Sequence, residues 1–242
     1  MGSVRSPGKV LADICGKPLL GRLIDRMAAV PGIGALVVAT TNKPEDDELA
    51  AWVKNQMGVP CFRGSTLDVL DRFYQCARKY QADRIVRLTG DDPLKDPAIV
   101  QEALALIEED LNLDYCSNTV YPTYPEGLDV EVFRFRALEQ AHSNARLKSE
   151  REHVTPYIWK HPELFRLKNF SYHKDLSAWR WTVDNPSDLE FMRLIYEHFR
   201  NDPLVSFEDV ITYLEQNPNI ALINSGALRN ESYLNSIKLD AE

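Results

Sequence analysis

The stretch RIVRLTGDDPL, residues 84–94, decides the fold class of this 242-residue chain. Its first six residues form a β-like run, and Gly90, Asp91, Asp92 and Pro93 are typical of the turn that follows. Both aspartates therefore lie at the carboxyl end of a strand, where open α/β sheets place their ligands. Carboxylates there suit Mg²⁺, which prefers oxygen ligands. A plain turn also explains these residues, so both interpretations stay open.

Strand-like and helical runs alternate on both sides of this stretch. Strands are expected at residues 35–40 and 59–63, and amphipathic helices at 44–57, 65–80 and 97–110. Such alternation predicts an α/β sheet with crossover helices.

The middle of the chain has β-like segments without long helices between them. They cover residues 114–120, 128–135, 165–172 and 180–183, with one helical stretch near 150–160. Strands connected in this way predict an antiparallel extension of the sheet.

The last part of the chain returns to helices. Apolar residues at helical spacing predict helices at 186–200 and 207–216, whereas residues 225–242 are polar enough to predict a loosely held tail. Because there is no internal repeat or linker, we expect one domain over residues 1–224, followed by this tail.

Composition narrows the class of protein. The chain has 28 Lys and Arg residues against 36 Asp and Glu, a formal net charge of −8. This balance disfavours nucleic-acid binding, which depends on neutralising phosphates. No run reaches the roughly 18–20 apolar residues of a membrane helix, no signal peptide is apparent, and four scattered cysteines disfavour a secreted disulfide scaffold. We therefore expect a soluble, reduced, cytoplasmic protein.

Two further segments carry residues suited to phosphate or metal chemistry. Near the N-terminus, Gly2 and Gly8 would let backbone N–H groups approach a ligand, and Arg5 and Lys9 supply positive charge. This is not a Walker motif, and an ordinary solvated loop is the alternative. Further along, Asp184 ends a predicted strand, where it could be a second metal carboxylate or the cap of the next helix.

Seven segments form an ordered set of motifs: GSVRSPGKVL, GKPLL, VLDRF, LTGDDPLKDP, YPEGLDVEVF, SEREHVTPYI and RWTVDNPSDLE. From Gly2 to about Asn224 they resemble the cytidylyltransferases that activate acidic sugars, such as the acylneuraminate and 3-deoxy-manno-octulosonate (Kdo) enzymes. The resemblance is greatest to the branch of spore coat polysaccharide biosynthesis protein F. It implies a nucleotidyltransferase domain of the nucleotide-diphospho-sugar-transferase type, a GT-A-like α/β fold with a Rossmann-like mixed sheet.

The resemblance also implies the parts of an active site. The loop with Ser3, Arg5 and Lys9 is similar to the family's site for the CTP phosphates, and Asp91 and Asp184 are similar to its two metal-binding aspartates. The implied catalytic residues are Lys9, Arg5 and Asp91. A sugar oxygen would attack the α-phosphate of CTP while Mg²⁺ and the two cationic side chains neutralise the leaving pyrophosphate.

Four residues are implied on the base and ribose side of the nucleotide. Thr40, Thr41 and Asn42 end an early strand at the place where the family contacts the base or ribose. Arg72 in VLDRF is similar to a position near the nucleotide, although a surface arginine on a helix is the alternative.

Two other motifs suggest the acceptor side of the site. In GLDVEVF, strand alternation places Asp129 and Glu131 on one face, where they could bind sugar hydroxyls or an amino group, or act as a base. A solvated strand face is the alternative. In SEREHVTPYI, Arg151 could meet a sugar carboxylate through its planar fork, and His153 could touch substrate or be structural.

The chain departs from the family pattern at its start. In the family, a first strand ending in arginine precedes the Gly-Ser loop, whereas Met1 here coincides with the methionine of that motif. The strand would lie inside the sheet, so its absence would expose two edges and remove a phosphate ligand. We therefore expect the natural protein to extend upstream of Met1.

The leading function is Mg²⁺-dependent cytidylyl transfer from CTP to an acidic sugar in the synthesis of a surface polysaccharide or flagellar glycan. One alternative is a nucleotidylyltransferase that uses another NTP and a sugar phosphate. Another is a nucleotide-sugar-binding protein that has lost catalysis, although two carboxylates at separate strand ends favour an enzyme. The resemblance also suggests a homodimer through residues 114–135.

Overall fold

The computed structural model describes residues 8–240. The strands are β1 (Asp13–Ile14), β2 (Lys17–Pro18), β3 (Val38–Thr41), β4 (Cys61–Gly64), β5 (Arg84–Arg87), β6 (Tyr115–Ser117), β7 (Glu131–Arg134) and β8 (Leu167–Asn169). The α-helices are α1 (Leu19–Ala28), α2 (Asp47–Gln56), α3 (Val69–Lys79), α4 (Pro97–Glu109), α5 (Phe135–Asn144), α6 (Lys148–His153), α7 (Pro156–Lys160), α8 (Pro186–His198), α9 (Phe207–Gln216), α10 (Pro218–Ala221) and α11 (Glu231–Asp240). Two short 3₁₀ helices are η1 (Lys9–Leu11) and η2 (Pro44–Asp46).

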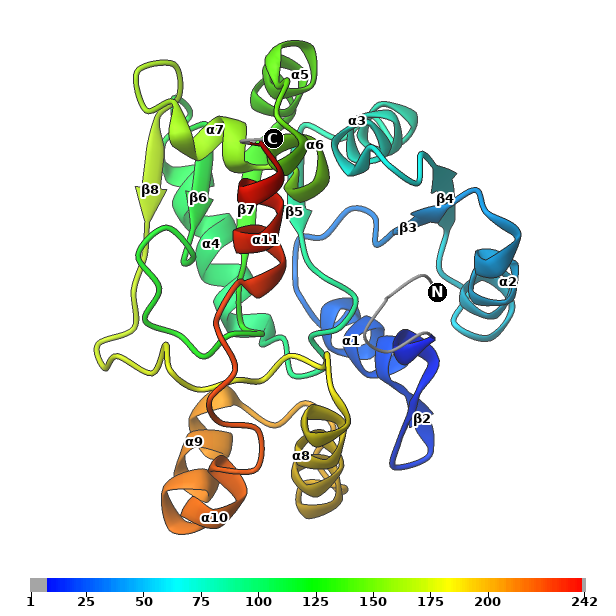
Figure 1. Cartoon of the computed structure of the whole chain (residues 1–242), viewed down its shortest axis with the longest axis vertical. Coiled ribbons are helices and arrows are strands. Elements are labelled where there is room, and N and C mark those ends of the chain that lie inside the picture. The colour runs from blue at the N-terminus through cyan, green and yellow to red at the C-terminus, as the bar shows by residue number, and fades with distance from the viewer. Residues whose placement is uncertain (1–7, 241–242) are drawn as a thin grey trace.

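Within residues 8–240 the strands form three small sheets (Figure 1). β1 and β2 are an antiparallel hairpin, β3 and β4 pair in parallel, and the largest sheet has the order β5-β7-β6-β8. In that sheet β7 runs antiparallel to both of its neighbours, while β6 and β8 are parallel. The mixed α/β class and the antiparallel extension are confirmed.

Helix α4 shows how local sequence builds these elements. Asp96 caps it by accepting a hydrogen bond from the Ala98 N–H at 2.7 Å, and Pro97 occupies the first helical position, where its missing N–H costs nothing. Ile99, Val100, Ala103 and Ile107 then recur at spacings of one, three and four residues, and all are buried. The helix therefore packs one apolar face into the core.

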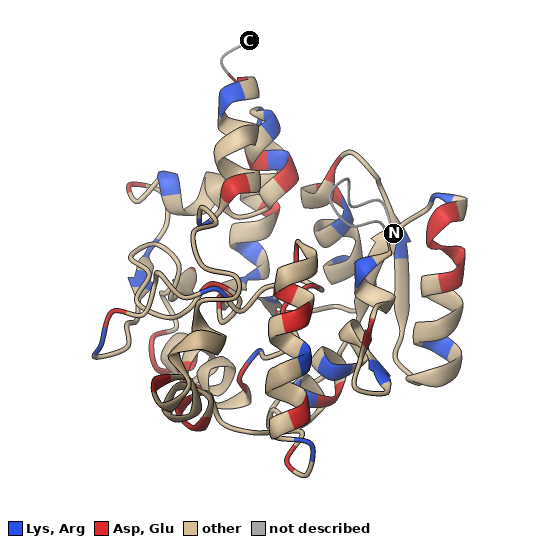
Figure 2. Ribbon diagram, turned by 60° about the horizontal axis from the view of Figure 1, so that its bottom comes forward, with Lys and Arg blue, Asp and Glu red and all other residues tan. Residues whose placement is uncertain are grey.

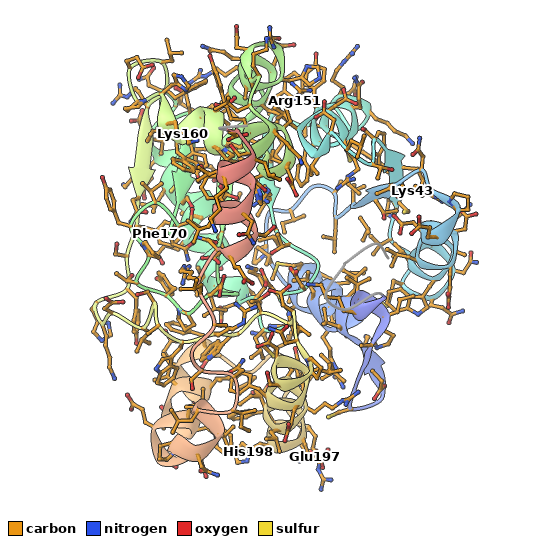
Figure 3. All side chains as sticks on the ribbon, in the orientation of Figure 1. Lys43, Arg151, Lys160, Phe170, Glu197 and His198 are labelled. Carbon is orange, nitrogen blue, oxygen red and sulfur yellow. The ribbon has the colours of Figure 1, made fainter. Side chains whose placement is uncertain are left out.

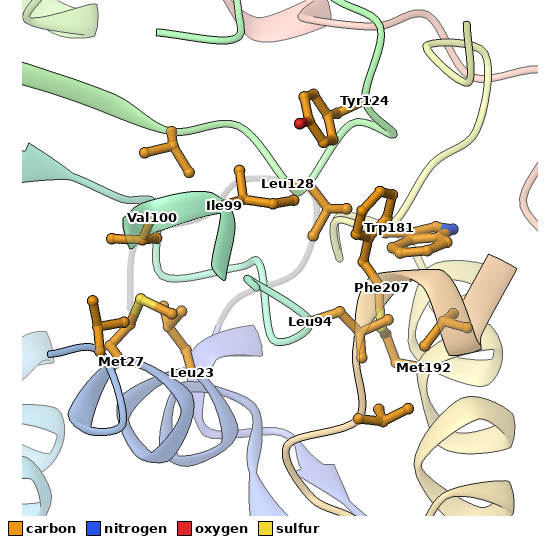
Figure 4. Close-up of a cluster of buried hydrophobic side chains, with 14 of the residues drawn as sticks. Leu23, Met27, Leu94, Ile99, Val100, Tyr124, Leu128, Trp181, Met192 and Phe207 are labelled. Carbon is orange, nitrogen blue, oxygen red and sulfur yellow. The ribbon is translucent and has the colours of Figure 1, made fainter. Parts of the chain in front are cut away.

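Two loops are anchored in that core by large side chains. Leu94 follows β5 and is 2% exposed, and Trp181 precedes α8 and is 1% exposed. Figure 4 shows both in the same cluster as Leu128 and Phe207. Burying an apolar side chain of this size stabilises the fold by roughly 1.5–3 kcal/mol. Both loops are therefore held in place next to their polar residues.

The strand expected at residues 180–183 is not formed, and this prediction was wrong. An isolated parallel bridge joins Arg180 to Glu126, and the Val183 N–H donates to the Asp91 carbonyl at 3.0 Å. The apolar alternation of Trp181 and Val183 reflects burial against the core and not membership of a sheet.

The helical stretch expected near 150–160 is two helices, α6 and α7. They separate at Val154, whose φ of 74° is left-handed, and Pro156 supplies no N–H to continue the first helix. Helix α5 was not predicted, because it follows β7 directly and its first residue was assigned to the strand.

The loosely held tail expected after residue 225 is corrected by helix α11, which contacts α6. Ser236 is buried and donates to Glu152 at 2.9 Å, and Asp240 accepts the Ser149 N–H at 2.9 Å. The docked face combines Ser236 with the Tyr233 ring, which packs against His153 and Trp159, whereas Leu234 is 44% exposed. Hydrophobic periodicity therefore gave no signal for this contact.

Charged residues of both signs are interspersed along the ribbon (Figure 2). In the part of the chain from residue 8 to residue 240, no helix combines the length and apolar character needed to span a membrane. The burial of particular charged side chains therefore distinguishes a site better than the distribution of charge along the chain.

Candidate active site

The centre of the site is a lysine held between two carboxylates. Lys9 Nζ lies 2.7 Å from Asp91 Oδ2 and 2.8 Å from Asp184 Oδ1, and it also donates to the Val183 carbonyl at 2.8 Å. Its side chain is 10% exposed. Burial by itself would lower the pKa of Lys9, but the two carboxylates raise it above its ordinary value. Lys9 is therefore a charged ammonium shared by both acids.

Backbone contacts bring the two aspartates together. Asp91 lies in the turn after β5, and Val183, next to Asp184, donates its N–H to the Asp91 carbonyl. Helix α8 is capped at Asn185, so the alternative reading of Asp184 as the cap is wrong. Asp188 accepts the N–H groups of Asp184 at 2.9 Å and of Asn185 at 2.8 Å. These two bonds fix the backbone at Asp184, whose carboxylate contacts Lys9.

Asp92, the second aspartate of the turn, faces inward. It is 3% exposed and accepts hydrogen bonds from Thr89 Oγ1 at 2.5 Å and from Lys95 Nζ at 2.9 Å. Burial raises the pKa of Asp92, against the opposing effect of the Lys95 ammonium. The turn is thus both structural, through Asp92, and part of the charged centre, through Asp91.

The donor set at this centre fits a divalent cation. Asp91 Oδ2 and Asp184 Oδ1 converge on one positively charged atom, as two ligands of a metal would. Mg²⁺ is usually held by one or two carboxylates together with waters and substrate phosphates. Among residues 8–240, no cluster of three or more His, Cys, Asp or Glu side chains suited to a metal occurs. A metal bound here would therefore take its remaining ligands from water or from the substrate.

Arg180 belongs to the centre although sequence reasoning did not single it out. It is 7% exposed on its side chain, and its Nη2 lies 2.5 Å from Asp184 Oδ2. Arginine four residues before a candidate metal carboxylate was the signal that could have identified it.

The structure describes only part of the predicted phosphate loop. Gly8 has a φ of 73°, a conformation that glycine adopts freely, and its carbonyl accepts the Leu11 N–H at 2.9 Å in η1, which carries Lys9. Gly2, Ser3 and Arg5 lie outside the described residues, so their predicted roles stay predictions.

The residues predicted for the base and ribose gather at the carboxyl ends of β3 and β4. The hydroxyls of Thr40 and Thr41 each donate to Asp46 Oδ2 at 2.6 Å, and the Asn42 N–H donates to the Gly64 carbonyl at 3.0 Å. Burial would raise the pKa of Asp46, but the hydrogen bonds from the two threonines help to hold it below its ordinary value. Asp46 thus fixes both threonines as an ionised acceptor.

Arg72 lies beside the same strand ends. Its Nη1 donates to the Ser65 carbonyl at 2.8 Å, and a Cβ at Gly64 would come within 2.9 Å of its Cγ. Burial lowers the pKa of Arg72, and Asp46 opposes this electrostatically. Arg72 is half-buried on α3 and packs over β4, and its role near the nucleotide stays a prediction.

The predicted acceptor acids are both paired with arginine. Asp129 forms an ion pair with Arg229, and Glu131 forms one with Arg87 while accepting the Tyr115 hydroxyl at 2.7 Å and the Thr155 hydroxyl. Glu131 is buried, so a solvated strand face is excluded for it. The structure does not bring either acid into contact with Asp91 or Asp184.

Arg151 and His153 lie on α6, away from the charged centre. Arg151, near the top of Figure 3, donates from Nε to Asp68 Oδ2 at 3.0 Å and from Nη1 to the His142 carbonyl at 2.8 Å. His153 Nε2 lies 3.0 Å from Ser236 Oγ on α11, and burial lowers its pKa. Both side chains are therefore occupied within the protein, and their substrate contacts stay predictions.

Comparison with known proteins places these features in a family. The cytidylyltransferase family model matches residues 1–222. An uncharacterized protein of Methanocaldococcus jannaschii is 38% identical over 238 residues, which cover 96% of this chain and 93% of that protein. The spore coat polysaccharide biosynthesis protein SpsF of Bacillus subtilis is 33% identical over 232 residues, which cover 91% of this chain and 93% of SpsF.

A solved structure supports the same assignment. The cytidylyltransferase from Leptospira borgpetersenii serovar Hardjo-bovis is 32% identical, with a TM-score of 0.88 over 94% of this chain and 95% of that one. The expected nucleotidyltransferase fold is confirmed by this agreement. The chain therefore belongs to the cytidylyltransferase family of enzymes.

Proposed function

We propose that this enzyme transfers a cytidylyl group from CTP to a sugar acid, with Mg²⁺ as cofactor and pyrophosphate as the leaving group. The observation that carries the proposal is the convergence of Asp91 Oδ2 and Asp184 Oδ1 on one cationic atom. Family membership supports the cytidylyl donor, and the similarity to SpsF supports a role in surface polysaccharide or glycan synthesis. The acidic acceptor rests on the motif resemblance.

Asp91 and Asp184 would hold the metal ion, which when bound would neutralise negative charge on the phosphates. Lys9 would then leave the space between them, because one point cannot hold two cations. Its flexible stem and three donors allow it to turn to a phosphate oxygen, and with Arg5 it would balance the charge of the leaving pyrophosphate. These four residues would therefore assist the transfer by neutralising and orienting the phosphates, without forming a covalent bond to the substrate.

No covalent nucleophile is required for this transfer. Burial raises the pKa of Cys76 and of Cys116 to about 11, so both remain protonated thiols near neutral pH. Their state agrees with a direct attack of the sugar oxygen on the α-phosphate.

The two ends of the substrate would lie on opposite sides of this centre. Thr40, Thr41, Asn42 and Arg72 are our candidates for the base and ribose, because they share the carboxyl ends of the parallel strands β3 and β4. On the acceptor side the candidates are Asp129, Glu131, Arg151 and His153. The Asp129 side chain is 25% exposed against 8% for Glu131, which makes Asp129 the more accessible acid. A homodimer and a cytoplasmic location stay predictions from the sequence.

One assay tests the proposal directly. The purified protein is incubated with CTP, ATP, GTP or UTP, Mg²⁺ and a panel of acidic sugars, and pyrophosphate release is measured with and without EDTA. We expect release with CTP and an acidic sugar, and none with EDTA. Release with another nucleotide and a sugar phosphate would overturn the donor and acceptor. Nucleotide binding without any release would overturn catalysis and indicate a binding protein.

A further inference from the structure

Arg180 is surrounded by three carboxylates from different parts of the chain. Its Nη2 donates to Asp184 Oδ2 at 2.5 Å, its Nη1 to Glu126 Oε2 at 2.5 Å, and its Nε to Asp188 Oδ1 at 3.1 Å. All three donor groups of the guanidinium are therefore in use. Its side chain is 7% exposed, so these bonds form largely out of water.

The other two acids are fixed independently of Arg180. Asp188 accepts the backbone N–H groups of Asp184 and Asn185 at the start of α8. Glu126 accepts the Asn230 N–H at 2.8 Å. Arg180 is thus held on two sides, and its remaining edge points at the Asp184 carboxylate.

Each oxygen of Asp184 has a different cationic partner. Oδ1 faces Lys9 Nζ and the Asp91 carboxylate, whereas Oδ2 faces Arg180. A carboxylate that is hydrogen-bonded through one oxygen cannot rotate freely, so the orientation of its second oxygen is fixed. When Lys9 gives way to a metal ion, the bond from Arg180 would remain.

We propose that Arg180 is a positioning residue that holds Asp184 in the orientation needed to bind the metal ion together with Asp91. The inference rests on the proposed function, because it assigns Arg180 a role toward the proposed Mg²⁺ site. Residues that hydrogen-bond to metal ligands typically change metal affinity or activity by about 10- to 100-fold when they are replaced.

The segment after α10 supports the same arrangement. Asn224 is buried, and its Nδ2 donates to the Arg180 carbonyl at 2.9 Å and to Asp188 Oδ1 at 3.0 Å. Asn224 contacts neither Asp184 nor Lys9 in these hydrogen bonds. Replacing Asn224 would therefore disturb the metal site through Arg180 and Asp188, by less than replacing Arg180 itself.

The test measures binding of Mn²⁺ alone, followed through the electron paramagnetic resonance signal of the free ion, in the wild type, Arg180→Lys, Asn224→Ala and Asp91→Asn. Lysine keeps the charge but lacks the planar fork that reaches three acceptors. We expect the Mn²⁺ dissociation constant to rise about 10- to 100-fold in Arg180→Lys and by a few-fold in Asn224→Ala. In turnover assays, Arg180→Lys should need more Mg²⁺ and recover activity at high Mg²⁺.

Arg134→Lys is the matched control, because Arg134 also bonds several groups inside the protein, the carbonyls of Leu113, Ile107 and Asp110. It should leave Mn²⁺ binding unchanged. Thermal unfolding identifies any variant that fails to fold. If Arg180→Lys does not fold, Mn²⁺ binding by Asn224→Ala tests the role of Arg180. If the wild type binds Mn²⁺ no better than Asp91→Asn, the proposed metal site is wrong. If the wild type binds it and folded Arg180→Lys and Asn224→Ala bind it equally well, the role of Arg180 is wrong.

Discussion

Two buried groups of charges in this molecule use the same kinds of side chain in different ways. At the centre, one ammonium, Lys9 Nζ, serves both Asp91 and Asp184, whose side chains are 26% and 15% exposed. In the β7 cluster, defined here as Glu131, Arg87, Tyr115 and Thr155, a single carboxylate that is 8% exposed receives a guanidinium and two hydroxyls.

The two groups differ in whether a ligand can replace the side chains that neutralise the carboxylates. A lysine has a flexible stem and can leave its acceptors, and two carboxylates at a strand end and a helix start would then face a new cation. Withdrawing Glu131 would leave a guanidinium and two hydroxyls buried without an acceptor, which is costly. A buried carboxylate therefore indicates a binding centre when its cationic partner is flexible and is shared with a second carboxylate, as Lys9 is. It indicates a structural cluster when its partners are fixed, as those of Glu131 are.

The largest expected effect is on catalysis at the centre. Asp91→Asn should lower turnover at least about 100-fold, because a neutral amide loses the charge that would hold Mg²⁺ while keeping the shape of the side chain. Asp110→Asn is the control, since Asp110 forms a surface ion pair with Arg166 at 3.3 Å. Pyrophosphate release measures turnover, and unfolding curves establish that both variants fold. Near-normal turnover in Asp91→Asn would remove Asp91 from the metal site.

A large effect on stability is expected in the β7 cluster. Glu131→Gln should lower the free energy of unfolding by about 3 kcal/mol, because it leaves Arg87 beside a neutral group in a buried position. Asp129→Asn, which breaks a more exposed pair with Arg229, should cost less than about 1 kcal/mol. Urea denaturation measures both. If Glu131→Gln were as stable as the wild type but raised KM for the sugar, Glu131 would be an acceptor ligand and the contrast between the two clusters would fail.

The sequence predicts a charged residue and its local structure, but it does not predict a partner that lies far away along the chain. Asp91 was predicted from the local sequence as part of the turn after β5, whereas Asp184 was predicted at the end of a strand that is not formed. Their partner Lys9 is 82 and 175 residues away, so the shared ammonium is a product of tertiary folding. Arg87 is likewise 44 residues from Glu131, so its pairing with that acid could not be predicted from the motif.

The fold shows the same limit. Helices α4, α8 and α9 were predicted because their capping residues and apolar faces are encoded in the sequence of the helix and its first neighbours. Helix α11 was missed because its docked residues include Ser236 and form no apolar stripe. Residues 180–183 were assigned to a strand because Trp181 and Val183 alternate with polar residues in the sequence, although all four side chains are buried.

A moderate effect tests the claim that the ammonium of Lys9 is replaceable. Lys9→Met should lower the free energy of unfolding by about 2 kcal/mol in EDTA, because two partly buried carboxylates would lose the cation between them. Mg²⁺ should restore most of the loss, and should stabilise this variant more than the wild type. Lys174→Met, which removes a surface pair with Glu215, is the control and should change little. Equal stability of Lys9→Met and wild type in EDTA would contradict the shared-ammonium interpretation.

The smallest expected effect concerns His153, which was predicted as a substrate contact but hydrogen-bonds α11 through Ser236. Burial lowers its pKa below the ordinary value of 6.5. Below about pH 6.5 the unfolded chain therefore binds a proton that the folded chain resists, so stability is complete above that pH and falls as the pH drops toward the folded pKa.

His153→Gln isolates this contribution, because glutamine can still bond Ser236 but does not titrate. The difference in unfolding free energy between wild type and His153→Gln should shift in favour of the variant as the pH falls from about 7.5 to about 5.5. A difference that stays constant with pH would show that His153 is not held neutral by α11. An unchanged KM for the sugar in His153→Gln would then indicate that His153 serves the docking of α11 and not the binding of substrate.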